Sequence, residues 1–290
     1  MADNREVDAT TNTETTGHEW DGIKELDTPM PRWWLWTFYA TIVWGVIYTI
    51  LMPAWPLINS ATPGLLGYST RQDAERELVE HAEVNAPLDA ALMEQAISKI
   101  AEDPELLSYA TAGGAAVFKA HCSQCHGAGA AGGVGYPNLL DDDWLWGGTA
   151  ADIEQTITHG IRYEDDGDTR YSEMPAFGDI LADEEISQLV NYVRSMSGLD
   201  HDGELAAPGE TLFVDNCASC HGEDGKGLNE FGAPNLTDSI WLYGGDPETL
   251  EETIRYSRYG IMPSFSYTGQ LDESDIRKVS IYVHTLGGGQ

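Results

Sequence analysis

Positive charge is what this chain lacks most. It has 15 lysines and arginines against 48 aspartates and glutamates in 290 residues, which gives a formal net charge of −33. Such a surface repels nucleic acid and anionic lipid headgroups, and it steers basic partners toward it. An acidity that serves only solubility explains the composition almost as well. The charge therefore argues against nucleic acid as a partner and leaves the reason for the acidic surface open.

Cysteine is also scarce. The four cysteines all lie in two copies of one pentapeptide, CSQCH at 122–126 and CASCH at 217–221. Zinc knuckles are usually separated by about 12–20 residues, whereas these copies begin 95 positions apart. A thioredoxin-type dithiol requires no histidine after its second cysteine. C-x-x-C-H is the signature of c-type haem attachment. We therefore predict two covalently bound haem c groups, attached through Cys122, Cys125, Cys217 and Cys220, with His126 and His221 as proximal iron ligands.

Methionine supplies the candidates for the sixth iron ligand. Met174 and Met262 share a Met-Pro-x-Phe frame, whereas Met196 ends an amphipathic run and is expected to pack in a core. Proline keeps the preceding residue out of helix, so each methionine is expected on an extended loop. Following the order of the chain, we predict His126 with Met174 and His221 with Met262. Histidine–methionine ligation raises the haem potential and closes both irons, which indicates electron transfer.

Two features of the first repeat are interpreted as having no ligand role. His159 is interpreted as a polar residue near the haem edge rather than a ligand, because its counterpart in the second repeat is taken to be Tyr259. Residues 162–173, between Ile161 and Met174, form an insertion, because Ile261 directly precedes Met262. The insertion is rich in aspartate, which suits a calcium loop. Its spacing does not match an EF-hand, so a solvated surface hairpin without metal is the prediction.

The two motifs belong to an internal repeat, which defines the architecture. Residues 113–126 parallel 208–221, and 137–139 parallel 234–236, both with the sequence PNL. Trp144 and Trp241 recur in the same way and are expected to form haem pocket walls. Strand patterns are weak, so we predict an all-α fold with two tandem class I cytochrome c domains. Each repeat ends in an apolar helical stripe: Ile186, Leu189, Tyr192 and Val193 in the first, and Ile276, Val279, Tyr282 and Val283 in the second.

Long apolar runs are absent except for one. Residues 33–52 contain no charge and number 20, which at about 1.5 Å per residue spans a hydrocarbon core of ~30 Å. Tryptophans stand at both ends, as at lipid–water boundaries. A cleaved signal peptide usually has a shorter apolar region nearer the N-terminus. A retained transmembrane helix at the head of the all-α fold is therefore predicted.

Charge and haem chemistry agree on the orientation of this helix. Arg5, Lys24 and Arg32 precede it and no lysine or arginine follows until Arg71, which places the N-terminus in the cytoplasm. Haem attachment through thioethers is expected in the bacterial periplasm. The sequence therefore divides into a cytoplasmic leader (1–31), a transmembrane anchor (32–54), a periplasmic helical linker (55–108), a first cytochrome c domain (109–198), a linker (199–205) and a second cytochrome c domain (206–290).

The leader and span carry a specific resemblance. The segments WDGIKELD at 20–27, PMPRWWLWT at 29–37 and PAWP at 53–56 resemble the dihaem subunit III (CcoP or FixP) of cbb3-type cytochrome c oxidases. The likeness continues through both haem motifs and both Met-Pro loops. It implies a single-pass subunit of a bacterial inner-membrane complex. Many members have a second span, and only one is visible here.

The resemblance also implies a function. The chain would accept electrons from a soluble or membrane cytochrome c and pass them through a monohaem subunit to the haem–copper subunit that reduces oxygen. It would itself be a non-catalytic electron-transfer subunit of an oxidoreductase complex. Two alternatives remain: a generic membrane-tethered dihaem shuttle, and a dihaem peroxidase. A peroxidase needs an exchangeable sixth position on one iron, and two matched methionine loops argue against it.

Overall fold

The computed structural model describes residues 5–289 and forms two compact units, Met1–Val84 and Asn85–Gln290. The first four residues of the predicted leader and the last residue of the predicted second cytochrome c domain lie outside the described residues. The division between the units falls within helix α2 (Thr70–Glu94).

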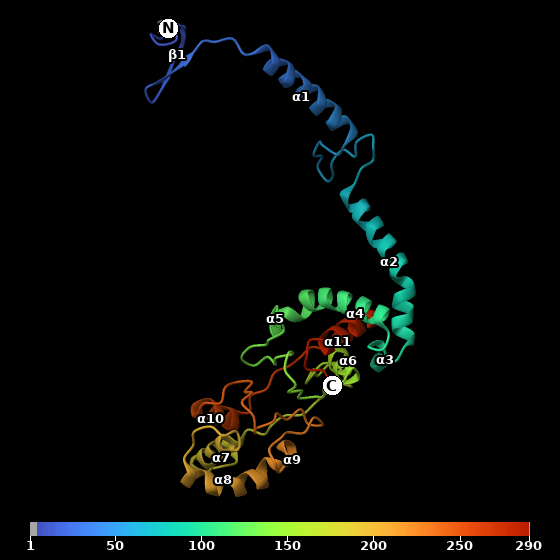
Figure 1. The fold of residues 1–290 in the computed structure, drawn as a ribbon, viewed down its shortest axis with the longest axis vertical. Helices are drawn as coiled ribbons and strands as arrows, with labels where there is room; N and C mark the ends of the chain where they lie inside the picture. The colour runs from blue at the N-terminus through green and yellow to red at the C-terminus, as the bar shows by residue number, and fades with distance from the viewer. Residues whose placement is uncertain (1–4, 290) are drawn as a thin grey trace. The chain divides into compact units, whose positions relative to one another are not determined.

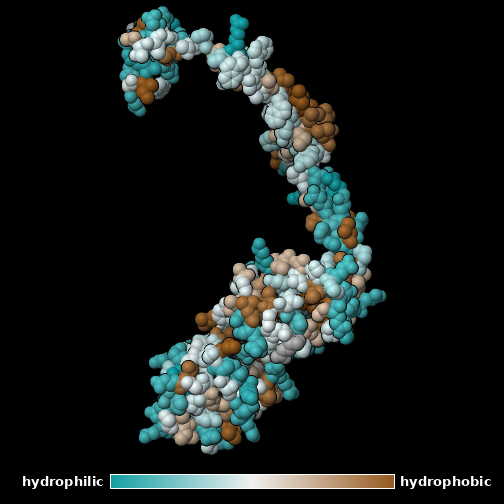
Figure 2. Space-filling model, viewed as in Figure 1, coloured by the Kyte–Doolittle hydropathy of each residue, from teal (hydrophilic) through white to brown (hydrophobic). Residues whose placement is uncertain are grey.

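The first unit contains the predicted membrane helix and a hairpin that the sequence analysis missed. Strands β1 (Thr15–Trp20) and β2 (Ile23–Leu26) pair antiparallel across Asp21-Gly22. Both turn residues have positive φ, as in the two-residue turns that favour Asp-Gly. Helix α1 (Arg32–Leu51) buries none of its side chains and is long and apolar enough to cross a membrane. Figure 2 shows hydrophobic side chains gathered along its later part.

The second unit is helical, as predicted, and its helices form two groups (Figure 1). The first lobe contains α3, α4, η1, α5, α6 and α11, and the second lobe contains η2, α7, α8, α9 and α10. Their bounds are α3 (Ile97–Ile100), α4 (Pro104–Val117), η1 (Phe118–Cys122), α5 (Ser123–His126), α6 (Ala150–His159), η2 (Phe177–Asp179), α7 (Asp183–Met196), α8 (Gly203–Asn216), α9 (Ala218–His221), α10 (Pro247–Tyr256) and α11 (Glu273–His284).

The lobes do not coincide with the two sequence repeats. Helix α4, which leads into the first C-x-x-C-H, packs on α11, the closing helix of the second repeat. Helix α8, which leads into the second motif, packs on α7, the closing helix of the first repeat. Each lobe therefore combines the first two-thirds of one repeat with the last third of the other.

A glycine at the same position of each repeat allows α4 to approach α11 closely and α8 to approach α7 closely. A Cβ at Gly114 would lie 2.2 Å from the Lys278 carbonyl oxygen on α11, and a Cβ at Gly209 would lie 2.3 Å from the Gln188 carbonyl oxygen on α7. Only glycine permits such close backbone approach. Phenylalanine–tyrosine pairs stand one turn further on, with ring centroids 5.5 Å apart for Phe118 and Tyr282 and 5.4 Å for Tyr192 and Phe213. The same contact thus recurs in both lobes, each time between different repeats.

The chain passes between the lobes twice, through residues 162–173 and 257–261. Arg162 at the start of the longer segment donates from Nη1 to the Gly260 carbonyl oxygen over 3.0 Å. Its guanidinium lies 5.3 Å from the centre of the Tyr259 ring. The two crossing segments therefore contact each other.

The end of α2 and helix α3 contribute side chains to the core of the first lobe. Leu92, Ile97 and Ile100 are buried in one cluster with Leu106 of α4 and Ile281 of α11. Leu92 and Ile100 therefore face the core of the first lobe. Asp89 of α2 holds the Lys278 ammonium at 2.7 Å, which fixes the end of α2 to α11.

Candidate haem-binding sites

Each C-x-x-C-H motif presents its histidine in the same way. His126 Nδ1 lies 3.1 Å from the Pro137 carbonyl oxygen, and His221 Nδ1 lies 3.1 Å from the Pro234 carbonyl oxygen. A proton on Nδ1 leaves the lone pair of Nε2 for a metal. Burial lowers the pKa of both imidazoles, although the carbonyl hydrogen bond acts in the opposite direction. Both histidines are therefore neutral and oriented, as an axial ligand must be.

The first cysteine of each motif is in a position that disfavours a reactive thiolate. All four are free, and Cys122 is buried whereas Cys125 is exposed. Burial, reinforced by the neighbouring cysteine, raises the pKa of Cys122 and of Cys217 to about 11. A thioredoxin-type centre requires a lowered thiol pKa. This geometry argues against the redox dithiol and agrees with attachment of a group by the thiols.

The packing does not support the predicted pairing of methionines with histidines. Met262 packs against the cluster that contains Cys122 and Phe118, in the first lobe. Met174 packs against the cluster of the second lobe, together with Cys217. The expectation that Met174 lies with the first motif and Met262 with the second is wrong. The cause is the two crossing segments, which carry each methionine to the other lobe.

Each lobe has residues that suit a haem wall. Leu139 and Trp144 pack against the first cluster, and their repeats Leu236 and Trp241 pack against the second. The indole N–H of Trp144 donates to the Gly288 carbonyl oxygen. The indole N–H of Trp241 is buried and has no partner among the described residues. A buried donor without an acceptor is costly, and a haem carboxylate is an acceptor that would satisfy it. The residues present therefore fit a haem group.

Met196 packs against the second cluster at the end of α7, as predicted for a core methionine. The N-terminus of α11 is capped, because the Asp272 carboxylate accepts from the Asp275 N–H over 2.8 Å.

The insertion at 162–173 is not the solvated hairpin that we predicted. Asp166 is only 9% exposed, and its carboxylate accepts from His159 and from Ser264. Arg170 pairs with Asp152 of α6 at 3.2 Å. His159 is the last residue of α6 and matches Tyr256, the last residue of the equally long α10, and not Tyr259. The sequence analysis missed Ser264, although its difference from Ala176 in the other Met-Pro-x-Phe frame was visible.

Two family models match the chain. The N-terminal domain of cytochrome oxidase-cbb3, FixP, matches residues 12–59. The model for cytochrome c oxidase, cbb3-type, subunit III, matches residues 110–193 and 204–283. The chain belongs to the CcoP/FixP family of cbb3-type cytochrome c oxidase subunits.

Curated members of this family align along nearly the whole chain. The cbb3-type cytochrome c oxidase subunit CcoP of Cereibacter sphaeroides is 60% identical over 278 residues, which cover 95% of each chain. The CcoP of Rhodobacter capsulatus is 54% identical over 286 residues, 96% of each chain. The FixP of Rhizobium meliloti is 46% identical over 291 residues and covers both chains completely.

The family confirms the resemblance and the fold class predicted from the sequence. Cytochrome c domains carry covalently bound haem c, and an electron-transfer role fits the family. Family membership and helix α1 together indicate a membrane-anchored subunit.

Proposed function

We propose that the chain binds two haem c groups and that each is ligated across the repeats. The first haem would be attached to Cys122 and Cys125, with His126 and Met262 on the iron. The second would be attached to Cys217 and Cys220, with His221 and Met174. The observation that carries this proposal is the packing of each methionine with the cysteine motif of the other repeat.

Bound haem c supplies a one-electron couple. The residues of the chain then have two tasks. The proline carbonyls keep each histidine in the tautomer whose Nε2 can ligate. The methionines would occupy the sixth position of each iron, and the apolar clusters that they pack against would limit the access of water. A protein ligand on each iron would support electron transfer and not peroxide chemistry.

The names of the relatives support a proposal about the partners. The relatives' names describe cbb3-type cytochrome c oxidase subunits. We propose that this chain relays electrons from a soluble or membrane cytochrome c to a monohaem subunit and then to the haem–copper subunit that reduces oxygen. The acidic composition supports a basic donor.

The membrane arrangement remains part of the proposal. The leader 1–31 would lie in the cytoplasm, residues 32–54 would cross the inner membrane once, and the chain from 55 onward would be periplasmic. The lysine and arginine distribution on the two sides of the helix supports this orientation.

Purification from native membranes in mild detergent, through a tag on this chain, tests the function. Co-elution with a high-spin haem b, copper and oxygen-reducing activity is expected. The mass of the chain should exceed its sequence mass by two haems, and Cys125→Ala or Cys220→Ala should perturb attachment at one site. A lone dihaem protein from the same membranes would support the shuttle instead. An unmodified mass would contradict both.

A further inference from the structure

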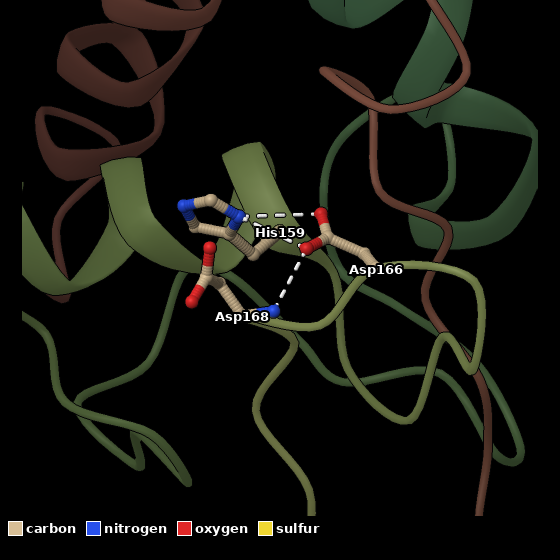
Figure 3. Close-up of side chains that lie close together, drawn as sticks. All are labelled: His159, Asp166 and Asp168. Carbon is tan, nitrogen blue, oxygen red and sulfur yellow. Dashed lines mark hydrogen bonds and ion pairs between the residues drawn. The ribbon is translucent and has the colours of Figure 1, made fainter.

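The crossing segment 162–173 places a carboxylate between two elements of the first lobe (Figure 3). The Asp166 carboxylate lies beside His159, whose Nδ1 is 3.2 Å from Oδ2 and 3.3 Å from Oδ1. The Asp168 N–H donates to Oδ1 over 3.0 Å. His159 ends α6, so the segment is fixed to that helix at its point of departure.

Ser264 connects this carboxylate to the second methionine loop, residues 262–265. Its side chain is fully buried, and its hydroxyl lies 2.7 Å from Asp166 Oδ2 and 2.7 Å from the Thr158 carbonyl oxygen. The same hydroxyl accepts from the Tyr267 N–H over 3.1 Å. The hydroxyl has one hydrogen to share between these two oxygens, and its displacement would leave the Tyr267 N–H without its acceptor, which is costly where the group is shielded from water. We call His159, Asp166 and Ser264 the Asp166 network.

The backbone of the second methionine loop is bound to the same place. Met262 and Ile161 exchange both N–H to carbonyl hydrogen bonds, each 3.0 Å long, and the Phe265 N–H donates to the Ile157 carbonyl oxygen over 3.3 Å. The Asp166 network therefore lies next to the backbone hydrogen bonds that hold Met262 against Ile161.

A metal site is the competing interpretation of this cluster. His159, Asp166 and Asp168 offer ligand atoms within 4.8 Å of one another. However, both Asp166 oxygens already accept from donors of the protein. The hydrogen bonds from Ser264 and from the Asp168 N–H also lower the pKa of the Asp166 carboxyl. These hydrogen bonds account for the position of the Asp166 carboxylate without a cation.

The other methionine loop, residues 174–177, has no equivalent of the network. Ala176 stands where Ser264 stands, and Tyr256, which is 68% exposed, stands where His159 stands. The crossing segment 257–261 is too short to provide a counterpart of Asp166. A surface hollow of about 630 Å³ is lined by residues 173–176 and 256–259 with Tyr243. None of residues 262–265 lines the hollow of about 470 Å³ beside α6.

We propose that His159, Asp166 and Ser264 are positioning residues that hold the second methionine loop closed, so that the methionine of the first lobe exchanges less readily than that of the second. This inference rests on the proposed ligation of the first haem by Met262. It adds that residues 162–173, the insertion in the first repeat, hold Met262, the ligand that the second repeat supplies. An exogenous ligand can bind only when the loop is open, so its apparent affinity scales with the open fraction.

Imidazole titration of the ferric holoprotein tests this inference. A Met174→His parent removes the sulfur–iron charge-transfer absorption of the second lobe, so that the remaining near-infrared band reports Met262 alone. In this parent, Ser264→Ala and Asp166→Ala are each expected to tighten apparent imidazole binding about tenfold. This is the lower end of the range of effects found when a residue that orients a metal ligand is removed. Asp166→Asn keeps an acceptor for Ser264 and should recover part of the difference.

Asp168→Asn is the matched control, because Asp168 contributes its backbone N–H to the network. It should leave the imidazole constant unchanged. Constants for Ser264→Ala and Asp166→Ala equal to that of the parent would overturn the inference. A parent constant that changes on addition of calcium and reverts with chelator would also overturn it, by showing a metal site. If the parent shows no sulfur–iron band at all, the proposed ligation by Met262 fails, which is a different result.

Discussion

The two lobes use one packing scheme but hold their methionine loops differently. In both, a glycine lets the leading helix of one repeat approach the closing helix of the other, and a phenylalanine–tyrosine pair follows. In the first lobe the methionine loop is bonded to α6 and backed by the buried Ser264. In the second lobe Ser257 donates to the Met174 carbonyl oxygen, beside a surface hollow. Under the proposed ligation, the shared fold would thus hold the two methionine ligands with different firmness.

Substitution of the glycines at the two helix contacts should have the largest effect on stability. Gly114→Ala and Gly209→Ala would each force a Cβ into a carbonyl oxygen of the opposite helix, and each should cost about 3 kcal/mol in the free energy of unfolding. Because each glycine belongs to one lobe, Gly114→Ala should weaken the sulfur–iron band due to Met262, and Gly209→Ala the band due to Met174. Thermal unfolding and near-infrared absorption measure both.

Gly113→Ala is the control for this prediction. Its Cβ would meet the Lys278 side chain at 2.9 Å and not a backbone atom, so the variant should lose less stability than Gly114→Ala. Equal losses for Gly113→Ala and Gly114→Ala would contradict the close helix contact.

Gly160 offers the next largest effect, and it acts on one lobe only. Its φ is +71°, and a Cβ there would lie 2.4 Å from the Met262 carbonyl oxygen. Gly160→Ala should cost about 2–3 kcal/mol and displace the second methionine loop. Imidazole should then bind the first-lobe haem more tightly than in the original protein. Gly167→Ala, whose Cβ would meet nothing within 4 Å, should change neither quantity.

Asp143 offers a smaller effect that reports on the contact between the lobes. Burial, and then the negative charges of Asp238, Asp141 and Asp142, raise the pKa of the Asp143 carboxyl to about 6. Folding therefore favours the protonated Asp143 carboxyl. The stability that depends on this proton is complete below the ordinary pKa near 4 and is lost as the pH rises through about 6.

Asp143→Asn removes this dependence. Between pH 5 and pH 7 the original protein should lose about 1 kcal/mol of stability relative to the variant, after allowance for solvent screening. Chemical denaturation at both pH values measures the difference. Parallel pH profiles for the two proteins would show that Asp143 ionises freely in the folded state.

The local features of the fold could be predicted from the sequence because local patterns determine them. The haem motifs, the apolar stripes of α7 and α11 and the membrane helix each depend on nearby residues. Which helices of the two repeats pack on each other could not be predicted in this way. The repeats are so alike that α4 could pack on either α7 or α11 with the same glycine and aromatic contacts, and distant contacts such as that of Asp89 with Lys278 distinguish the arrangement that forms.

The role of the insertion was missed for a related reason. Its aspartates give the composition of a solvated loop, and the partners of Asp166 lie up to 98 positions away in the sequence, at Ser264. The hairpin of β1 and β2 was missed because its strands, of 6 and 4 residues, are short.

One measurement tests the crossed ligation most directly. A chain with Cys217→Ala and Cys220→Ala retains attachment cysteines in the first lobe alone, and its ferric near-infrared band then reports a single iron. Met262→Ala in that chain should abolish the band and give a high-spin spectrum, whereas Met174→Ala should leave the band in place. Loss of the band with Met174→Ala and its survival with Met262→Ala would contradict the account.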